Sequence, residues 1–139
     1  MEEKFVWTEE YSVQNAVIDG QHKTFFDIAN DLSGLAAQEN VKREDIFSGA
    51  TKLRSYALFH LGTEEEMFSK YGYNGTEHIA AHNAFRNKVE EMMNAVRSES
   101  ADAKKEALNM AEFSASWLRN HIMVMDKQYA PFFTEKGLE

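Results

Sequence analysis

The sequence predicts an all-α protein, an up-down-up-down antiparallel four-helix bundle with an N-terminal arm, and three observations favour this fold. Four stretches carry apolar residues at intervals of three and four, which is the spacing of one helix face. The 139 residues include one proline and seven glycines, so long uninterrupted elements are favoured. Short polar breaks separate the stretches, and helices joined by short loops lie antiparallel to their sequence neighbours. We therefore expect a single domain over residues 1–139.

The N-terminal third is expected to contribute an arm and the first helix. Residues 1–18 lack a helical repeat, and we interpret them as an arm laid over the bundle. The first helix is expected over about 19–38, where Asp19 would cap it because a short side-chain oxygen accepts from the free amides of the first turn. The second helix is expected over about 43–71, and the turn Gly72-Tyr73-Asn74-Gly75 ends it.

The remaining two helices follow the same pattern. The third helix is expected over about 75–97, and Asn74 followed three residues later by Glu77 predicts a capping box at its start. The fourth helix is expected over about 103–129, and Pro131 is expected to help end it, because proline disfavours helix at the residue before it. Two aromatic residues beyond the proline are expected to fold back against the bundle: Phe132 and Phe133.

Composition excludes several classes of protein. The net charge of −8 argues against general binding to nucleic acids or anionic membranes. There is no cysteine, which excludes disulfides and thiolate metal sites. No stretch reaches the roughly 18–20 apolar residues that a membrane span needs, and the acidic N-terminus does not look like a signal peptide. We expect a cytoplasmic protein without membrane insertion, and the oligomeric state is left open, with a monomer compatible.

All five histidines continue the predicted apolar faces, three, four or seven residues from an apolar neighbour. They are His22, His60, His78, His82 and His121. Glu64 lies on the same face, four residues after His60. These groups lie near the start of the first and third predicted helices and near the end of the second and fourth, which is one end of an up-down bundle. At about 1.5 Å rise per residue, six polar side chains are expected within roughly two turns of one another.

Such a buried layer predicts a metal site. Burying an unpaired polar group costs roughly 2–7 kcal/mol, whereas imidazole suits Fe, Zn, Cu and Ni, and a carboxylate can bridge two cations. Asp126 follows His121 by five residues, an offset of about 140°, and a relaxed helix end would make it a second bridge. A single histidine on an apolar face is usually an ordinary core residue, but the complete set at one level favours metal. In the run Glu64-Glu65-Glu66, only Glu64 is expected to point inward.

These motifs resemble the hemerythrin family, and the single-domain bacteriohemerythrins in particular. The segments that carry the resemblance extend along most of the chain. They are W-T-E-E-Y-S-V at 7–13, I-D-G-Q-H at 18–22, H-L-G-T-E-E at 60–65, H-I-A-A-H at 78–82 and W-L-R-N-H-I-M-V-M-D-K-Q-Y at 117–129. Two departures concern pocket shape and loop geometry. Leu61 stands where the family usually has Phe, and the loop between Tyr73 and His78 is one residue shorter and lacks the usual proline.

The resemblance implies a protein that is not an enzyme and binds O2 reversibly, carrying it as hydroperoxide at two iron ions (Fe2+/Fe3+) joined by a bridging oxo or hydroxo oxygen. By the same resemblance one iron would be held by His78, His82 and His121, and the other, with an open position, by His22 and His60. Glu64 and Asp126 would bridge the pair. The implied wall of the O2 pocket comprises Leu118, Trp117, and Phe25 or Phe26.

Three alternatives remain open at this point. The first is an O2- or redox-sensing module that acts through a partner protein, which the lack of a second domain disfavours. The second is a di-iron oxidase or peroxidase, including a catalyst of nitric oxide or peroxide removal. Five histidines and two carboxylates disfavour it, because ferritin-like di-iron proteins use four glutamates and two histidines. The third is a structural zinc site.

Overall fold

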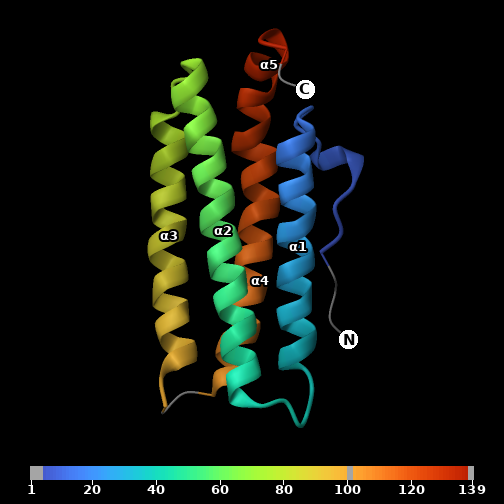
Figure 1. Cartoon of the computed structure of the whole chain (residues 1–139), viewed down its shortest axis with the longest axis vertical. Helices are drawn as coiled ribbons and strands as arrows, with labels where there is room; N and C mark the ends of the chain where they lie inside the picture. The colour runs from blue at the N-terminus through green and yellow to red at the C-terminus, as the bar shows by residue number, and fades with distance from the viewer. Residues whose placement is uncertain (1–4, 100–101, 138–139) are drawn as a thin grey trace.

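The computed structural model describes residues 5–99 and 102–137, and these residues form a bundle of four long antiparallel helices (Figure 1). The helices are α1 (Ala16–Ala36), α2 (Arg43–Tyr71), α3 (Thr76–Arg97) and α4 (Ala103–His121). The described residues include no β-strand. The predicted all-α up-down-up-down bundle is therefore confirmed.

An N-terminal arm runs alongside α1 and contains one short 3-10 turn, η1 (Glu9–Tyr11) (Figure 1). The backbone N–H and C=O of Phe5 bond to the side-chain amide of Asn30, at 3.0 and 2.8 Å. The Phe5 ring stacks on Phe26 with centroids 6.1 Å apart, and Tyr11 lies against the same ring at 5.9 Å. The arm is thus fastened to the outer side of α1. Residues 1–4 of the expected arm lie outside the described residues.

The start of α1 differs from the prediction. The helix begins three residues earlier than expected, and Asn15 caps it by accepting from the backbone N–H of Ile18 at 3.0 Å. Asp19 is not the cap. Its carboxylate instead accepts from the backbone N–H of Val13 at 2.9 Å and from the Ser12 hydroxyl at 2.7 Å. Asp19 therefore ties the arm to the helix, a contact that only the folded arm creates.

The junction between α2 and α3 matches the prediction at the first end and departs from it at the second. The second helix ends at Tyr71 and is capped by Gly72, whose φ of 74° is the left-handed conformation that glycine adopts readily. The predicted capping box is wrong, because α3 begins at Thr76 with Gly75 at its N-cap and no side-chain cap. Asn74 accepts from the Thr76 hydroxyl at 3.0 Å instead. A close approach requires glycine here, since a Cβ at position 75 would lie 2.6 Å from Cδ2 of Phe68.

We expect Gly75→Ala to destabilise the protein by about 1–3 kcal/mol, because the added methyl group would overlap a ring that is itself buried. Urea unfolding followed by circular dichroism measures the change. Gly62→Ala is the matched control, because nothing lies within 4 Å of its added Cβ in the middle of α2. That control should gain about 0.5–1 kcal/mol from helix propensity. Equal losses in both variants would contradict the packing argument.

The fourth helix continues further than predicted. A π-helical turn, η2 (Ile122–Asp126), follows α4, and the chain then runs on as α5 (Lys127–Glu135). The expectation that Pro131 ends the helix is wrong, because Pro131 lies inside α5. Tyr129 and Phe133 explain this continuation, since both are buried with ring centroids 5.5 and 6.3 Å from that of Phe68. Burial of two aromatic rings outweighs the roughly 3 kcal/mol that an internal proline costs.

Phe132 and Phe133 pack against the bundle, as expected, but they do so as part of α5. Phe133 is 1 % exposed, and Phe132 is half-buried with its ring 5.2 Å from that of Tyr73. In Figure 1, α5 extends the α4 rod beyond the end of α1.

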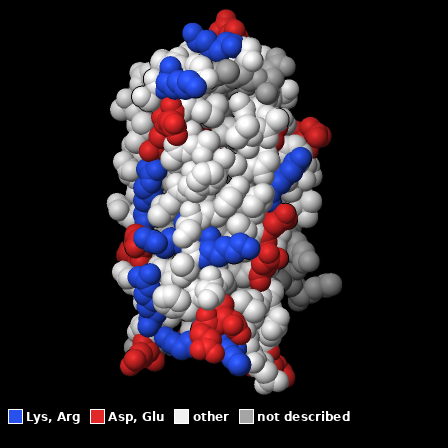
Figure 2. Space-filling model, viewed as in Figure 1, with Lys and Arg blue, Asp and Glu red and all other residues white. Residues whose placement is uncertain are grey.

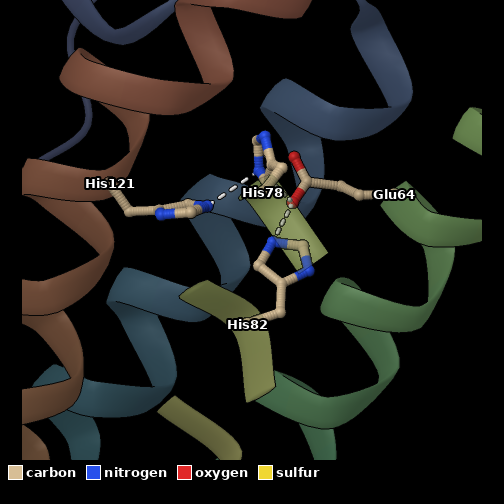
Figure 3. Close-up of side chains that lie close together, drawn as sticks. All are labelled: Glu64, His78, His82 and His121. Atoms are coloured by element: carbon tan, nitrogen blue, oxygen red, sulfur yellow. Dashed lines mark hydrogen bonds and ion pairs between the residues drawn. The ribbon is translucent and has the colours of Figure 1, made fainter. Parts of the chain in front are cut away.

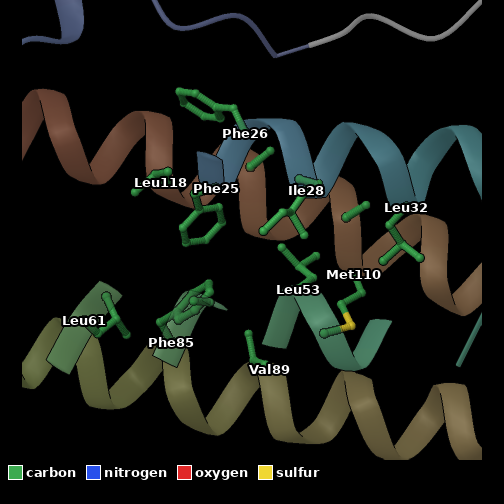
Figure 4. Close-up of a cluster of buried hydrophobic side chains, with 14 of the residues drawn as sticks. Phe25, Phe26, Ile28, Leu32, Leu53, Leu61, Phe85, Val89, Met110 and Leu118 are labelled. Atoms are coloured by element: carbon green, nitrogen blue, oxygen red, sulfur yellow. The ribbon is translucent and has the colours of Figure 1, made fainter. Parts of the chain in front are cut away.

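The core lies along the bundle axis and receives apolar side chains from all four helices (Figure 4). The members drawn there are at most 7 % exposed, and they include Phe25, Leu32, Leu53, Phe85, Val89, Met110 and Leu118. Each fully buried side chain of this size contributes about 1.5–3 kcal/mol. The helices are thus held in a fixed register on either side of the polar layer described below.

Charged residues of both signs are interspersed on the face of the molecule in Figure 2, and much of that face is uncharged. No basic patch dominates this view, although Lys and Arg are present on it. No helix in the described ranges has the length and apolar character that crossing a membrane requires.

Candidate metal centre

The seven residues singled out in the sequence meet in one buried layer at the end of the bundle where α1 and α3 begin. The helices α1, α2, α3 and α4 supply the histidines, α2 supplies one carboxylate and η2 the other. Every one of the seven is at most 6 % exposed: His22, His60, Glu64, His78, His82, His121 and Asp126. The agreement of face and level predicted from the helical repeat therefore holds in three dimensions.

One group of donors comprises Glu64, His78, His82 and His121, each of which offers a ligand atom within 4.8 Å of the others (Figure 3). The Nε2 atoms of His78 and His121 are 2.8 Å apart. The Nε2 atom of His82 lies 3.2 Å from Oε1 of Glu64. These side chains come from α2, α3 and α4, and Figure 3 shows them pointing toward one another.

A second group comprises His22, His60, Glu64 and Asp126, whose ligand atoms also lie within 4.8 Å of one another. The Nε2 atoms of His22 and His60 are 3.1 Å apart. The Nε2 atom of His22 lies 3.1 Å from Oδ2 of Asp126. This group is drawn from α1, α2 and the end of η2.

Both carboxylates face both groups. Oε1 of Glu64 lies 3.2 Å from Nε2 of His82 and 3.6 Å from Nε2 of His60. Asp126 directs Oδ1 toward Nε2 of His78 at 2.9 Å and Oδ2 toward Nε2 of His22 at 3.1 Å. Two carboxylates shared between two donor groups form the arrangement that bridges a pair of cations.

The π turn explains how Asp126 reaches this layer. In a regular α-helix its side chain would point about 140° away from that of His121. The wider π turn over Ile122–Asp126 changes that direction, and Oδ1 of Asp126 lies 3.2 Å from Nε2 of His121. The relaxed helix end that the sequence analysis required is this turn, a form of bulge often found at functional sites.

Two residues that bind the Nδ1 atoms of the histidines, on the side away from the donor groups, were not predicted from the sequence. Oε1 of Gln21 accepts from Nδ1 of His60 at 2.8 Å, and the Glu65 carboxylate accepts from Nδ1 of His82 at 2.8 Å. Glu65 also accepts from Arg86 at 2.7 Å. The expectation that only Glu64 of the run Glu64-Glu65-Glu66 points inward is therefore wrong, because the Glu65 carboxylate reaches His82. The positions of the two residues in the sequence could have indicated this role, because Gln21 directly precedes His22 and Glu65 directly follows Glu64.

The donor set fits metal ions. Oε1 of Gln21 accepts a hydrogen bond from Nδ1–H of His60. The Nε2 atom of the neutral His60 ring therefore carries a lone pair, which faces the buried layer. Four buried atoms there accept no hydrogen bond of regular geometry from the described residues: Glu64 Oε1, His82 Nε2, and Asp126 Oδ1 and Oδ2. Two nitrogens bound at about 2.1 Å and at right angles to one metal are about 3.0 Å apart. The observed Nε2 separations of 3.1 and 2.8 Å agree with that spacing.

The protonation states of His60 and Asp126 also suit metal binding. Burial lowers the pKa of His60 from 6.5 to about 4, so its imidazole is neutral. Burial alone would raise the pKa of Asp126, but the imidazoles of His121, His22 and His78 outweigh it and hold that pKa well below its usual range. Metal ligands must be deprotonated, and these groups are.

Glu64 is held in its ionised form by similar means. Burial and the charge of Asp126 raise its pKa, whereas His60 and His82 lower it, and the net direction is down. The hydroxyl of buried Tyr129 donates a hydrogen bond to Oε2 of Glu64. Burial and the neighbouring carboxylates raise the pKa of Tyr129 well above 10, so it remains a donor.

The residues expected to wall an O2 pocket divide into two sets. Phe25 and Leu118 are fully buried, and the Phe25 ring lies 6.3 Å from that of His60. Trp117 is half-buried and stacks on His121 with centroids 4.3 Å apart. Phe26 does not lie with them. Successive helix residues point about 100° apart, so Phe26 faces the arm while Phe25 faces the core (Figure 4).

The fold and the site together define a class, the four-helix-bundle proteins whose core carries cation-binding groups. Comparison with known proteins agrees: the family model described as Hemerythrin HHE cation binding domain matches residues 14–133. The chain belongs to the hemerythrin family, which confirms the resemblance seen in its motifs.

Individual relatives match along nearly their whole length. The bacteriohemerythrin of Clostridium acetobutylicum is 30% identical over 128 residues, which are 90% of this chain and 98% of that protein. The bacteriohemerythrin of Methylococcus capsulatus is 31% identical over 127 residues, 90% of this chain and 93% of that protein. A crystal structure of wild-type hemerythrin superposes with a TM-score of 0.76 at 30% identity, covering 91% of this chain and 95% of that one.

Proposed function

We propose that this chain holds a pair of iron ions in the buried layer and binds O2 reversibly there. The observation that carries the proposal is the pair of overlapping donor groups that share Glu64, with Asp126 facing both. Membership of the hemerythrin family supports iron over zinc. When bound, the iron pair supplies the electrons that allow O2 to be captured and released.

The donors divide unequally between the two ions. His78, His82 and His121 would hold one ion, and His22 and His60 would hold the other. Glu64, which belongs to both donor groups, and Asp126, which faces both, would contribute to each. The group of His22 and His60 offers one histidine fewer, so it is the one that would leave room for O2.

The rest of the chain excludes water from this layer and holds the Glu64 carboxylate in place. The donors are buried, and Phe25 and Leu118 add apolar walls. Tyr129 holds Glu64 through its hydroxyl. Among the described residues the only buried carboxylates are Glu64 and Asp126, and both are needed as bridges. That leaves no further buried carboxylate for proton transfer, which favours a carrier over an oxidase.

The test loads metal-free protein with Fe2+ under anaerobic conditions. Two irons per chain are expected, with a visible absorption band that develops with O2 and disappears when O2 is removed. Steady consumption of O2 with excess reductant would indicate an oxidase or peroxidase, and native protein with zinc and no iron would indicate a structural site. A partner that binds only in one O2 state would indicate a sensor. The cytoplasmic location and the absence of a nucleic-acid partner stay predictions.

A further inference from the structure

We infer that the two cation positions are unequal in affinity, and that Glu65 is a positioning residue that makes the position of His78, His82 and His121 fill first. We call this the three-histidine position, and that of His22 and His60 the two-histidine position. The inference rests on the proposed metal pair, but not on iron or O2.

The difference between the positions begins outside the ligands. Nδ1 of His82 and Nδ1 of His60 each donate a hydrogen bond of 2.8 Å, so the two contacts are equal in length. They differ in charge, because the acceptor is the Glu65 carboxylate in one case and the neutral Gln21 amide in the other. An anionic acceptor draws the Nδ1 proton more strongly and makes Nε2 a better electron donor to a metal.

Glu65 is held in place for this role. Arg86, on the same helix as His82, donates to the same carboxylate oxygen at 2.7 Å and also contacts Asn83 at 2.9 Å. The guanidinium fixes the direction of the carboxylate. Both side chains of this ion pair are partly exposed, at 27 and 23 %, so water weakens the attraction between them.

The two-histidine position has weaker outer support. Among the described residues, the side-chain amide nitrogen of Gln21 has one contact, a long one of 3.4 Å to the Thr63 hydroxyl. Nδ1 of His22 is buried and has no hydrogen-bond partner among the described residues. The two imidazoles of the two-histidine position therefore share one neutral acceptor, the Gln21 amide. The three-histidine position has an additional imidazole and an anionic acceptor, the Glu65 carboxylate.

The consequence is ordered loading. The first metal ion enters the three-histidine position, and the second completes the two-histidine position, which is also the first to empty when metal is limiting. The O2-binding ion would then be the labile one of the pair.

Titration of the metal-free protein with Zn2+ in isothermal calorimetry, with a competing chelator, tests this order without redox chemistry. The wild type should give two separate steps. His60→Ala should remove the second step and keep the first, while His82→Ala should weaken the first. Glu65→Gln should lower the affinity of the first step by about 10–100-fold, and Glu65→Asp should recover part of that loss. Gln21→Glu is the reciprocal change and should strengthen the second step.

The outcomes separate the hypotheses. Two equal steps in the wild type, or an unchanged first step in Glu65→Gln with native circular dichroism, would overturn the inference. A chain that binds no Zn2+ would overturn both the inference and the metal pair. Two unequal Zn2+ steps combined with an iron-loaded protein that ignores O2 would remove the proposed function and leave the inference standing.

Discussion

Replacing Glu64 by Ala is expected to reduce the bound iron from two ions per chain to one at most, and to abolish the O2-dependent absorption band. Glu64 belongs to both donor groups, and its Oε1 lies within 3.6 Å of both His60 and His82. Its removal therefore takes one ligand from each ion and the bridge between them. The measurement is iron content per chain after anaerobic loading and desalting, together with the spectrum in air.

Glu66→Ala is the matched control for this prediction. Glu66 is the same residue type two positions along α2, but it is exposed and absent from both donor groups. Its replacement should leave two irons per chain and an unchanged spectrum. Circular dichroism of the Glu64 variant is measured alongside, because the change leaves the buried Tyr129 hydroxyl without its acceptor. Two retained irons in folded Glu64→Ala would contradict the assignment of Glu64 as a bridge.

Removing the metal is expected to cause the largest loss of stability of any treatment considered for this protein. Without metal, the buried layer keeps lone-pair atoms of Glu64, His82 and Asp126 without regular hydrogen bonds. At a free metal concentration 100-fold above the dissociation constant, each bound ion contributes about 2.7 kcal/mol, so two contribute about 5 kcal/mol. For a chain of this length that corresponds to a fall in Tm of about 15 °C or more on chelation.

Differential scanning calorimetry of Zn2+-loaded and chelator-treated protein measures this change. Zn2+ is preferred because it has no redox chemistry that could damage the chain on heating. The same pair of scans on Glu64→Ala is the control, and the difference between its two Tm values should be much smaller. An unchanged Tm after complete metal removal would mean that the layer is satisfied without metal, and would contradict the site.

Some helix bounds could be predicted from the sequence, and others could not. The second helix has its expected bounds of 43–71, because a long helical repeat is followed directly by Gly72 in the left-handed conformation. The predicted start of the first helix was wrong because Asn15 and Asp19 are both good caps, and only the folded arm, which binds Asp19, shows that Asn15 is the cap. The prediction that Pro131 ends the fourth helix failed for a similar reason, because the burial of Tyr129 and Phe133 depends on Phe68 in another helix.

By itself, the sequence determined the helical bundle and the convergence of five histidines and Glu64 on one layer. Both follow from a repeat of three and four residues and from short loops, which are local properties. The tertiary structure alone decided how Asp126 joins that layer through a π turn, why Phe25 and not Phe26 faces the core, and that Gln21 and Glu65 hold His60 and His82. Those features depend on contacts between side chains of different helices, and such contacts cannot be predicted from the spacing of residues along the chain.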